Sequence, residues 1–345
     1  MGLNIKDIVV RKDTSIKKLA GKVLVVDAHN NLYQYLTTIR QRDGLPFTNS
    51  KGQVTSHLIG LFNRTTTLME EGLFLAFVFD GKPPALKYAT TAQRKEAKVE
   101  AQRLYQEAEK RGDVESMRKY ASRTAYLTPE MIEESKVLLR ALGLPVIQAP
   151  SEAEAQAAHM VKMGDAYASV SQDFDSLIFG CPLFIRNLSI EGRKKIPGTP
   201  RYTTVQPEII SLVENLNALG VDIDQLIALA ILIGTDYNPG GVKRIGPKTA
   251  LKLVKEYGTD FPGLFQQVGW DAADGDWKEI VQTIKQMPVT DQYHLEWQRP
   301  DGPLLQRLLI GEYGFSEERV VSKVHKLEEL YRGVGQTGLQ KWFSS

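Results

Sequence analysis

The sequence predicts an α/β fold with a mostly parallel central sheet flanked by helices. Short apolar, β-branched runs recur along the first half of the chain, and several of them end in an acidic residue. Segments with helical spacing separate these runs, and the chain becomes mainly helical from about residue 221. Strand and helix alternation is typical of a parallel sheet, whose ligand site lies beyond the carboxyl ends of its strands.

The first two predicted strands each end in an aspartate. KVLVVD, residues 22–27, follows a glycine and is typical of a buried strand that ends at Asp27. A helix is expected from about Asn30, and residues 54–71 show helical spacing. LFLAFVFDG then repeats the strand-then-acid pattern at Asp80. The two aspartates are therefore expected at one edge of the sheet.

The segment after Pro84 is expected to stand away from the core. Residues 85–128 are helix-prone, hold ten Lys/Arg against six Asp/Glu, and offer few apolar side chains to bury. Lys87 and Arg94 are seven residues apart, so they share a helix face and could clamp a phosphate. The alternative for most of these charges is a solvated surface, because glutamates interleave with the basic residues.

Two further strand and helix units follow. A helix is expected from Thr128 to Leu142, and LPVIQA is the third strand. A helix over residues 151–163 comes next, and AYASVSQDFDS contains a fourth strand that runs into two acids. The apolar helix in DQLIALAILIGTDYN then leads to another acid.

Seven acidic residues lie at the ends of these predicted elements. They are Asp27, Asp80, Glu152, Glu154, Asp173, Asp175 and Asp236. Phosphodiester hydrolysis by two Mg²⁺ ions about 4 Å apart needs such a cluster, because hard cations prefer oxygen ligands. Asp173 and Asp175 are two apart, so in extended chain they would point to the same side and could share a metal.

Glu152 and Glu154 also have a purely structural interpretation. Residues two apart on a helix diverge, and Ser151 followed by Glu154 matches a capping box. Acids are favoured in any first helical turn by the helix dipole. From these two residues alone, capping is preferred to catalysis, and a turn-forming role is the default for any single strand-end aspartate. Only the whole set favours a metal site.

A basic connection joins two predicted helices. In GGVKRIGPKTA, residues 240–250, small residues allow a turn that presents N–H groups and a helix N-terminus to phosphate. Residues 242–255 carry five basic residues and no acid, which favours sequence-independent contact with duplex DNA. The predicted contacts are Gly240, Gly241, Lys243, Arg244, Gly246, Lys248 and Lys252. The alternative is an ordinary helix-turn-helix connection with a solvated face.

The last residues combine large apolar side chains with polar flanks. Leu339 and the Trp342-Phe343 pair are three apart, so one helical turn would gather them as an apolar plug. Exposed aromatics of this size seldom lack a partner. The alternative is that they pack back on their own domain.

Composition narrows the class of protein. With 345 residues and 42% apolar content, the chain can bury one large core or two modest ones. Cys181 is the one cysteine, so neither an intramolecular disulfide nor a Cys/His zinc site is expected, and an intracellular setting fits. No apolar run reaches the roughly 20 residues that span a bilayer, so no membrane role is expected. Basic residues concentrate in separate segments, which suits a polyanionic partner.

The chain closely resembles the flap endonucleases, especially the compact archaeal type, over essentially its whole length. The matching strings are VVDA, FVFDGKPPALK, APSEAEAQAA, ASVSQDFDS, ILIGTDYNPGGVKRIGPKTAL and QTGLQKWF. The resemblance implies a PIN-like nuclease core, a helical arch and a helical C-terminal DNA-binding region. The implied divisions are residues 1–84 and 129–235 for the core, 85–128 for the arch, 236–331 for the helical region with its hairpin at 240–250, and 332–345 for a clamp-binding tail.

The resemblance also implies an activity. Family members are structure-specific 5′-flap endonucleases with 5′–3′ exonuclease activity, which cut branched DNA at the single-strand/duplex junction in Okazaki fragment processing and repair. The seven acids would bind two Mg²⁺ ions, directly or through water, and Mn²⁺ could substitute. Lys87 and Arg94 would contact the scissile phosphate, and Tyr33 would stack on a base near the cleavage point.

Further implied contacts lie at the two ends of the chain and at the hairpin. Gly2, exposed if Met1 is removed, would lie near the site, and a K⁺ ion would bind at the hairpin. The tail residues Gln336, Leu339, Trp342 and Phe343 would dock on a PCNA-type sliding clamp. The protein itself would be a monomer, located in the cytoplasm or nucleoid if the source is archaeal.

Two positions depart from the family pattern. Arg244 stands where the hairpin usually has its first glycine, which argues against a tight turn with positive φ at that position. His29 occupies a variable position and is expected to be solvated or to lie behind the metal ligands.

The sequence alone leaves other functions open. A PIN-type ribonuclease or a phosphatase with a D-x-D loop also needs acids at strand ends, and a non-catalytic, clamp-bound DNA scaffold is a third class. Neither rival enzyme predicts the hairpin, the arch and the clamp-binding tail together. A scaffold with a decayed site would have lost carboxylates.

Overall fold

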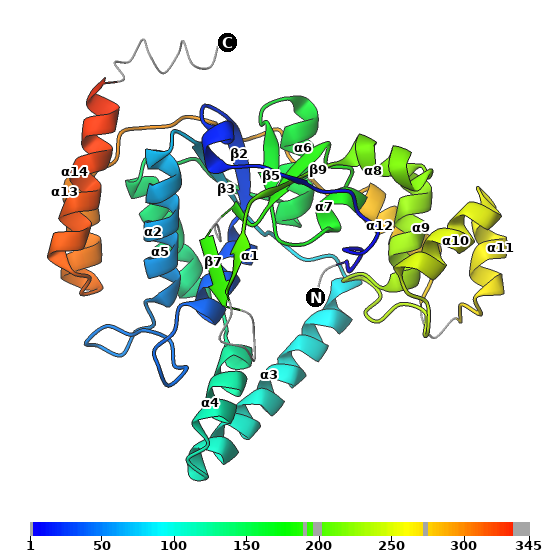
Figure 1. The fold of residues 1–345 in the computed structure, drawn as a ribbon, viewed down its shortest axis with the longest axis horizontal. Coiled ribbons are helices and arrows are strands. Elements are labelled where there is room, and N and C mark those ends of the chain that lie inside the picture. The colour runs from blue at the N-terminus through cyan, green and yellow to red at the C-terminus, as the bar shows by residue number, and fades with distance from the viewer. Residues whose placement is uncertain (1–2, 189–191, 196–201, 272–274, 334–345) are drawn as a thin grey trace.

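A seven-stranded mixed sheet forms the centre of the molecule in the computed structural model, which describes residues 3–188, 192–195, 202–271 and 275–333 (Figure 1). The strand order is β1-β9-β6-β5-β2-β3-β4. The strands are β1 Lys12–Asp13, β2 Val23–Asp27, β3 Phe74–Phe79, β4 Val146–Gln148, β5 Ala168–Val170, β6 Leu183–Arg186 and β9 Glu208–Ser211. A separate two-stranded hairpin contains β7 Gly192–Lys195 and β8 Tyr202–Val205.

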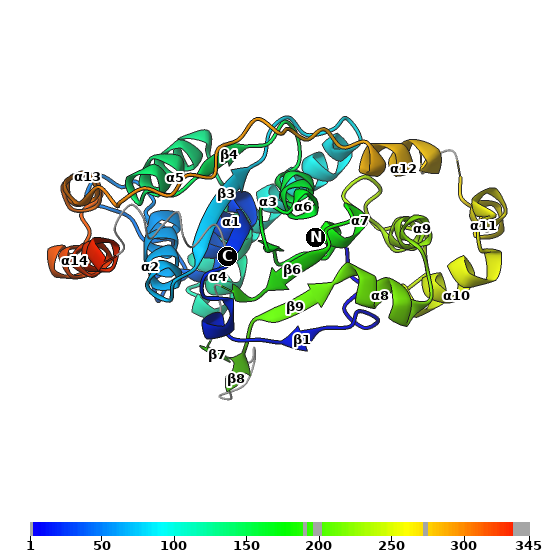
Figure 2. The same ribbon diagram turned by 90° about the horizontal axis from the view of Figure 1, so that it is seen from above.

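Helices cover both faces and both ends of the sheet. Those of the first half are η1 Ile16–Leu19, α1 Ala28–Thr38, α2 Ser56–Glu70, α3 Lys87–Lys110, α4 Val114–Ala121, η2 Ser122–Thr124, α5 Pro129–Ala141, α6 Ala153–Met163 and α7 Asp175–Ile178. Those of the second half are α8 Leu212–Leu219, α9 Ile223–Ile233, α10 Pro247–Tyr257, α11 Phe261–Gln267, α12 Trp277–Lys285, α13 Gly302–Gln306, η5 Arg307–Glu312 and α14 Glu317–Gly333. Figure 2 shows α2, α5, α13 and α14 at one end of the sheet and α9 to α12 at the other.

The prediction of a mostly parallel sheet is confirmed. Strands β4, β3, β2, β5 and β6 all run in the same direction, so their carboxyl ends meet at one edge. Strands β9 and β1 add an antiparallel margin that the sequence did not predict. Both are short and carry little apolar alternation, which is the signal by which such strands are found.

Side-chain caps set where the helices begin. Helix α1 starts at Ala28, slightly earlier than expected, because the Asp27 carboxylate accepts a hydrogen bond from the Asn30 N–H at 3.0 Å. Helix α5 starts as predicted, with the Thr128 hydroxyl oxygen accepting from the Met131 N–H at 3.2 Å. At both positions a short polar side chain next to the strand or loop fixes the first helical turn.

The predicted capping box at Ser151 is wrong. Helix α6 begins at Ala153 with Glu152 as its N-cap, and no side chain of the cap residue bonds back into the helix. The Ser151 hydroxyl donates to the Lys82 carbonyl at 2.9 Å instead. The Asp80 carboxylate accepts from the Ala153 N–H at 2.7 Å, so the acceptor for this helix terminus comes from the neighbouring strand.

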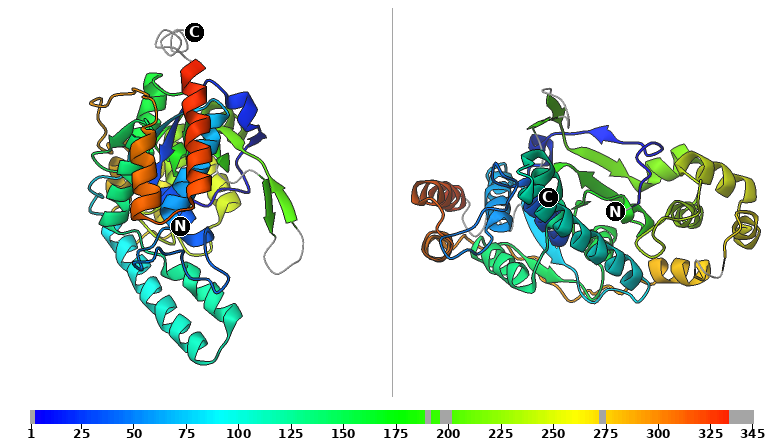
Figure 3. Two further views of the ribbon diagram at one scale, coloured as in Figure 1. Left: turned by 90° about the vertical axis from the view of Figure 1, so that its left-hand side faces the viewer. Right: turned by 90° about the horizontal axis from the view of Figure 1, so that it is seen from below.

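Helices α3 and α4 form a hairpin that projects from the core beside the carboxyl edge of the sheet, as Figures 1 and 3 show. Most of its side chains are exposed, and the buried ones include Ala101, Tyr105 and Ala108 along α3. The polar stretch predicted to stand away from the core therefore does so as a two-helix unit.

No single helix among the described residues has the length and apolarity needed to cross a bilayer. Helices α8 and α9, bent by 80° at their junction, meet that requirement together by length and composition only.

Gly60 marks a close contact between α1 and α2 and provides a test of the fold. A Cβ atom at this position would lie 2.3 Å from Cγ of Tyr35 and 2.7 Å from Cδ1 of Ile39, so Gly60→Ala should destabilise the protein by about 2 kcal/mol despite alanine's higher helix propensity. Chemical denaturation measures the change. Gly311→Ala, where no atom lies within 4 Å of the new Cβ, is the control and should leave stability unchanged or higher. Equal stability for both variants would contradict tight packing of α1 on α2.

Candidate active site at the carboxyl edge of the sheet

The seven predicted acids all lie at or beside the carboxyl edge of the parallel strands. Asp27 ends β2 and Asp80 follows β3, while the other five lie in the segments after β4, β5 and α9. One small cavity is lined by Glu152, Glu154, Asp175 and Asp236 together. The charges of Asp80 and Asp173 also act on Asp27, so the fold brings acids from distant parts of the chain near one another.

Neighbouring polar groups orient several of these carboxylates. Asn30 contacts two of them, because its backbone N–H donates to Asp27 and its side-chain Nδ2 donates to Asp173 at 3.1 Å. The Ser171 hydroxyl donates to Glu154 at 2.5 Å. Directional hydrogen bonds of this kind hold the acids in place without neutralising them.

The backbone at Asp175 is not the extended strand that the sequence predicted. Asp175 begins helix α7 and accepts a hydrogen bond from the Leu3 N–H at 3.0 Å, so the chain from Asp173 to Asp175 is not an extended strand. The premise that both side chains point to the same side by strand alternation is therefore wrong. They still interact, because the charge of Asp173 contributes to the raised pKa of Asp175.

Two cationic side chains of helix α3 reach into the cluster. The Lys87 ammonium pairs with the Glu152 carboxylate and lies 3.3 Å from Asp236, and Arg94 contacts Asp236 at 2.5 Å. Thr90, between them on α3, donates its hydroxyl to the Asp236 carbonyl at 2.5 Å. The first two turns of the arch are thus fastened to the loop after α9.

The acids of the cluster are costly to ionise. Desolvation raises the pKa of Asp27 and Glu154 well above the usual range, and neighbouring carboxylates raise both further. Desolvation, with the charges of Asp173 and Asp236, raises the pKa of Asp175 to about 7. The nearby carboxylates, above all Glu152, overcome the burial of Lys87 and raise the pKa of its ammonium, so Lys87 stays charged.

This donor set fits hard divalent cations. It consists of carboxylate oxygens, and their raised pKa values show that additional positive charge would stabilise the ionised cluster. Within the described part of the chain, no three acidic, histidine or cysteine side chains converge closely enough to enclose one ion. Lys87 lies between the carboxylates of Glu152 and Asp236, and Arg94 pairs with Asp236 alone.

The predicted hairpin follows Asp236 directly. Gly240 and Gly241 both have positive φ, and a Cβ at Gly241 would lie 2.3 Å from the carbonyl carbon of Ile233. Gly246 is the N-cap of α10. The basic side chains of the hairpin, Lys243, Arg244, Lys248 and Lys252, are all exposed. A helix N-terminus and four cations therefore face solvent on one connection.

Arg244 adopts the conformation that the sequence argued against. Its φ is 68°, so a non-glycine residue takes the left-handed turn at this position. The Ile245 N–H donates to the Val242 carbonyl at 3.1 Å and closes the turn that contains Arg244, so a non-glycine residue adopts a backbone conformation that costs it free energy.

The remaining predicted contacts fall on different parts of the chain. Tyr33 is on α1, is 37% exposed, and lies under the Lys98 ammonium of the arch. Gly2 and the tail residues Gln336, Leu339, Trp342 and Phe343 lie outside the described residues.

Of the two positions expected for His29, the structure has the one behind the acids. Its side chain is largely buried, its Nδ1 accepts from the Asp80 N–H at 3.1 Å, and burial lowers its pKa, so the ring is neutral. Other residues of the site were not identified from the sequence. Tyr237 lines the acid cavity, and desolvation raises the pKa of its phenol. His29, Asn30 and Tyr237 each lie within three residues of a predicted metal ligand in the sequence. That proximity is the signal by which they could have been identified.

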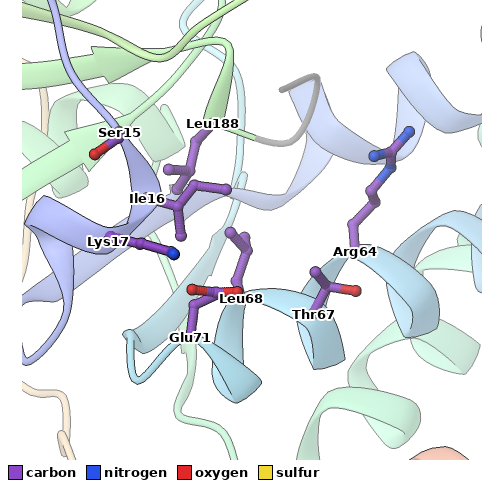
Figure 4. Close-up of a pocket in the computed structure, with 8 residues that line it drawn as sticks. All are labelled: Ser15, Ile16, Lys17, Arg64, Thr67, Leu68, Glu71 and Leu188. Atoms are coloured by element: carbon purple, nitrogen blue, oxygen red, sulfur yellow. The ribbon is translucent and has the colours of Figure 1, made fainter. Parts of the chain in front are cut away.

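Other cavities lie away from the acids. Figure 4 shows one of about 390 Å³ between η1, α2 and the end of β6, where the charged ends of Lys17 and Glu71 face the same space. Another, of about 560 Å³, lies between α5 and η5 and is lined by Glu130, Glu133 and Glu134. None of the seven predicted acids lines either cavity.

Comparison with known proteins matches the chain along its length. Residues 3–101 match the XPG N-terminal domain and residues 143–236 match the XPG I-region. The flap endonuclease 1 of Pyrococcus horikoshii is 48% identical over 343 residues, covering 99% of this chain and 98% of the relative. That of Staphylothermus marinus is 46% identical over 351 residues, with both chains fully covered.

Solved structures give the same family and fold. The flap endonuclease-1 from Methanococcus jannaschii superposes with a TM-score of 0.75 at 40% identity, covering 96% of this chain and 99% of that one. The catalytic core of Rad2 in complex with DNA substrate has a TM-score of 0.69 at 23% identity, covering 95% and 100%, and shares the fold.

The raised pKa of Asp175 predicts how the metal-free protein responds to pH. The folded protein binds more protons than the unfolded one between the ordinary pKa of 3.8 and about 7, so the free energy of unfolding should fall as pH rises through this window. Asp175→Asn should stabilise the chelator-treated protein at pH 8 by up to about 4 kcal/mol and flatten the pH dependence. Denaturation at pH 5 and pH 8 measures both effects. Asp7→Asn, an exposed carboxylate, is the control, and a destabilised Asp175→Asn would contradict the electrostatic argument.

Proposed function

This chain belongs to the flap endonuclease family, and we propose that its carboxylate cluster is the place where a 5′ strand is cut from branched DNA. The chain is a structure-specific 5′-flap endonuclease, a nuclease of the type that acts in DNA replication and repair. The site assignment is supported by the position of the seven acids at or beside the carboxyl edge of the sheet, where four of them line one small cavity and Lys87 and Arg94 pair with two of those four.

The acids would hold two divalent cations, Mg²⁺ or in its place Mn²⁺. Family nucleases depend on divalent metal, and the ligands proposed here are Asp27, Asp80, Glu152, Glu154, Asp173, Asp175 and Asp236, directly or through water. When bound, such ions activate water for attack on the phosphodiester and stabilise charge on the leaving oxygen. Asn30, Ser171 and the Leu3 N–H would keep four of these carboxylates oriented.

Lys87 and Arg94 would bind the scissile phosphate. Both project from the first turns of α3 into the cluster, and Thr90 fixes that part of the helix against the Asp236 carbonyl. Their cationic groups would stabilise the negative charge that develops on the phosphate oxygens during cleavage. Residues 85–128 would form the arch through or beneath which the 5′ strand passes, and Tyr33 would stack on a base beside it.

The remaining DNA and partner contacts are proposed from the same assignment. The hairpin at residues 240–250 would grip the downstream duplex through backbone N–H groups, basic side chains and a K⁺ ion, without reading base edges. Gly2 would lie near the site. The tail, through Gln336, Leu339, Trp342 and Phe343, would dock on a PCNA-type sliding clamp while the enzyme acts as a monomer.

Cleavage of defined substrates tests the assignment. Purified protein with Mg²⁺ should cut labelled 5′-flap DNA at the junction, with little cutting of 3′-flap, hairpin or RNA substrates. Asp175→Asn should lower the rate by about 10³-fold or more, because several kcal/mol of transition-state stabilisation are lost, while flap binding stays detectable. Asp7→Asn should cut normally. Preferred cutting of RNA would favour a PIN-type ribonuclease, and no cutting of any substrate would favour a scaffold.

Arg244 separates two physical effects in the hairpin. Arg244→Gly should raise stability by about 1 kcal/mol, because glycine adopts positive φ without strain, and should lower the salt dependence of DNA binding by about 0.9 in log K per log salt, because one phosphate contact is lost. Lys248→Ala should lower the salt dependence equally without the gain in stability. Denaturation and DNA binding at several salt concentrations measure both, and an unchanged salt slope for both variants would exclude the hairpin from DNA contact.

A further inference from the structure

The Lys98 ammonium of the arch lies against two tyrosine rings. It is 5.0 Å from the ring centre of Tyr33 and 5.2 Å from that of Tyr126. Tyr33 belongs to α1, Lys98 to α3, and Tyr126 to the segment that leads from η2 back into the core. The three side chains thus meet where the stem of the arch joins the sheet edge.

Both rings keep surface available to a ligand. Tyr126 is 61% exposed and Tyr33 is 37% exposed. The backbone of Tyr126 is nevertheless fixed, because Ala125 and Leu127 on either side of it are buried in the core. An exposed aromatic ring on an anchored backbone is a preformed surface for stacking, since little conformational freedom is lost when a ligand binds.

Lys98 differs from Lys87 and Arg94 in its partners. Lys87 and Arg94 pair with carboxylates, whereas across the described residues Lys98 has no carboxylate within ion-pair distance and is held by the two rings and the Tyr33 hydroxyl at 3.5 Å. Arg94 and Lys98 are four residues apart, so they share one face of α3. A row of cations therefore leads from the carboxylate cluster to the two tyrosines.

We propose that Tyr126, with Lys98 and Tyr33, forms a binding site for the unpaired strand, in which Tyr126 stacks on a nucleobase and Lys98 contacts the adjoining phosphate. This inference rests on the proposed function, because it takes the substrate to be a DNA with an unpaired 5′ strand. Sites for single strands combine aromatic platforms with positive charge, and each stacked base contributes without regard to its sequence. Tyr126 therefore holds the flap beyond the base that Tyr33 contacts.

A purely structural role for Tyr126 predicts a different result from a stacking role. If the two rings served only to fasten the arch stem through Lys98, loss of Tyr126 would weaken binding of any strand placed under the arch. Stacking requires a base on the DNA. The comparison of a normal flap with a flap of abasic sites, which keeps the phosphates and removes the bases, therefore separates the two roles.

The test measures binding of 5′-flap DNA to the full chain by fluorescence anisotropy in Ca²⁺. Tyr126→Leu should bind a normal flap about tenfold more weakly than the unchanged protein does. The two proteins should bind an abasic flap with about equal affinity. Tyr126→Phe should keep the affinity of the unchanged protein for the normal flap. A 2-aminopurine in the flap should be quenched by the unchanged protein and regain fluorescence with Tyr126→Leu. Thermal denaturation checks that the variant is folded.

Tyr167→Leu is the matched control. Tyr167 is 39% exposed and lies under a lysine, Lys22, at 5.2 Å, but it precedes β5 at the opposite edge of the sheet. Its replacement should leave both affinities unchanged. Equal losses on normal and abasic flaps, or no loss on either, would overturn the stacking role of Tyr126. Failure of the unchanged protein to cut any flap would instead overturn the proposed function, and the binding comparison would still stand on its own.

Discussion

Repulsion among carboxylates at the sheet edge is the constraint around which this molecule is built. Five parallel strands deliver their carboxyl ends to one place, and the acids that follow them are desolvated and close enough to raise one another's pKa. Such a cluster destabilises the folded chain unless cations approach it. The hydrogen bonds from Asn30, Ser171 and Leu3 orient the carboxylates but supply no full positive charge.

The arch supplies part of that charge. Lys87 lies between Glu152 and Asp236, and Arg94 pairs with Asp236 from a more exposed position. Because Thr90 bonds to the Asp236 carbonyl, the same loop that carries a carboxylate also fixes the root of α3. The position of helix α3 and the electrostatics of the cluster therefore depend on the same contacts.

The sequence predicted the parts of this arrangement that depend on local pattern. Apolar runs, caps and charge predicted the strand ends at Asp27 and Asp80, the helix start at Thr128, and the projection of residues 85–128 away from the core. The structure has all of these features. It failed where a distant segment intervenes. The terminus of α6 takes its acceptor from Asp80 and not from Ser151. The positive φ of Arg244 was missed for a local reason, because glycine is only the preferred residue in such a turn. The structure decides between the two positions expected for His29, and it shows Tyr237 at the acid cavity, which the sequence did not predict.

Under the proposed function, a phosphate that enters this site would compete with the carboxylates for Lys87 and Arg94. Arg94 is 44% exposed, so solvent screens its ion pair with Asp236. Replacing Asp236 by a phosphate as its partner would therefore cost little free energy. Lys87 is more deeply placed, and separating it from Glu152 would leave a buried carboxylate without a partner. Divalent cations bound by the acids would remove that cost, because they replace the ammonium as the counter-charge. Metal binding and phosphate binding would then favour one another through the two arch side chains, with no movement of the sheet required.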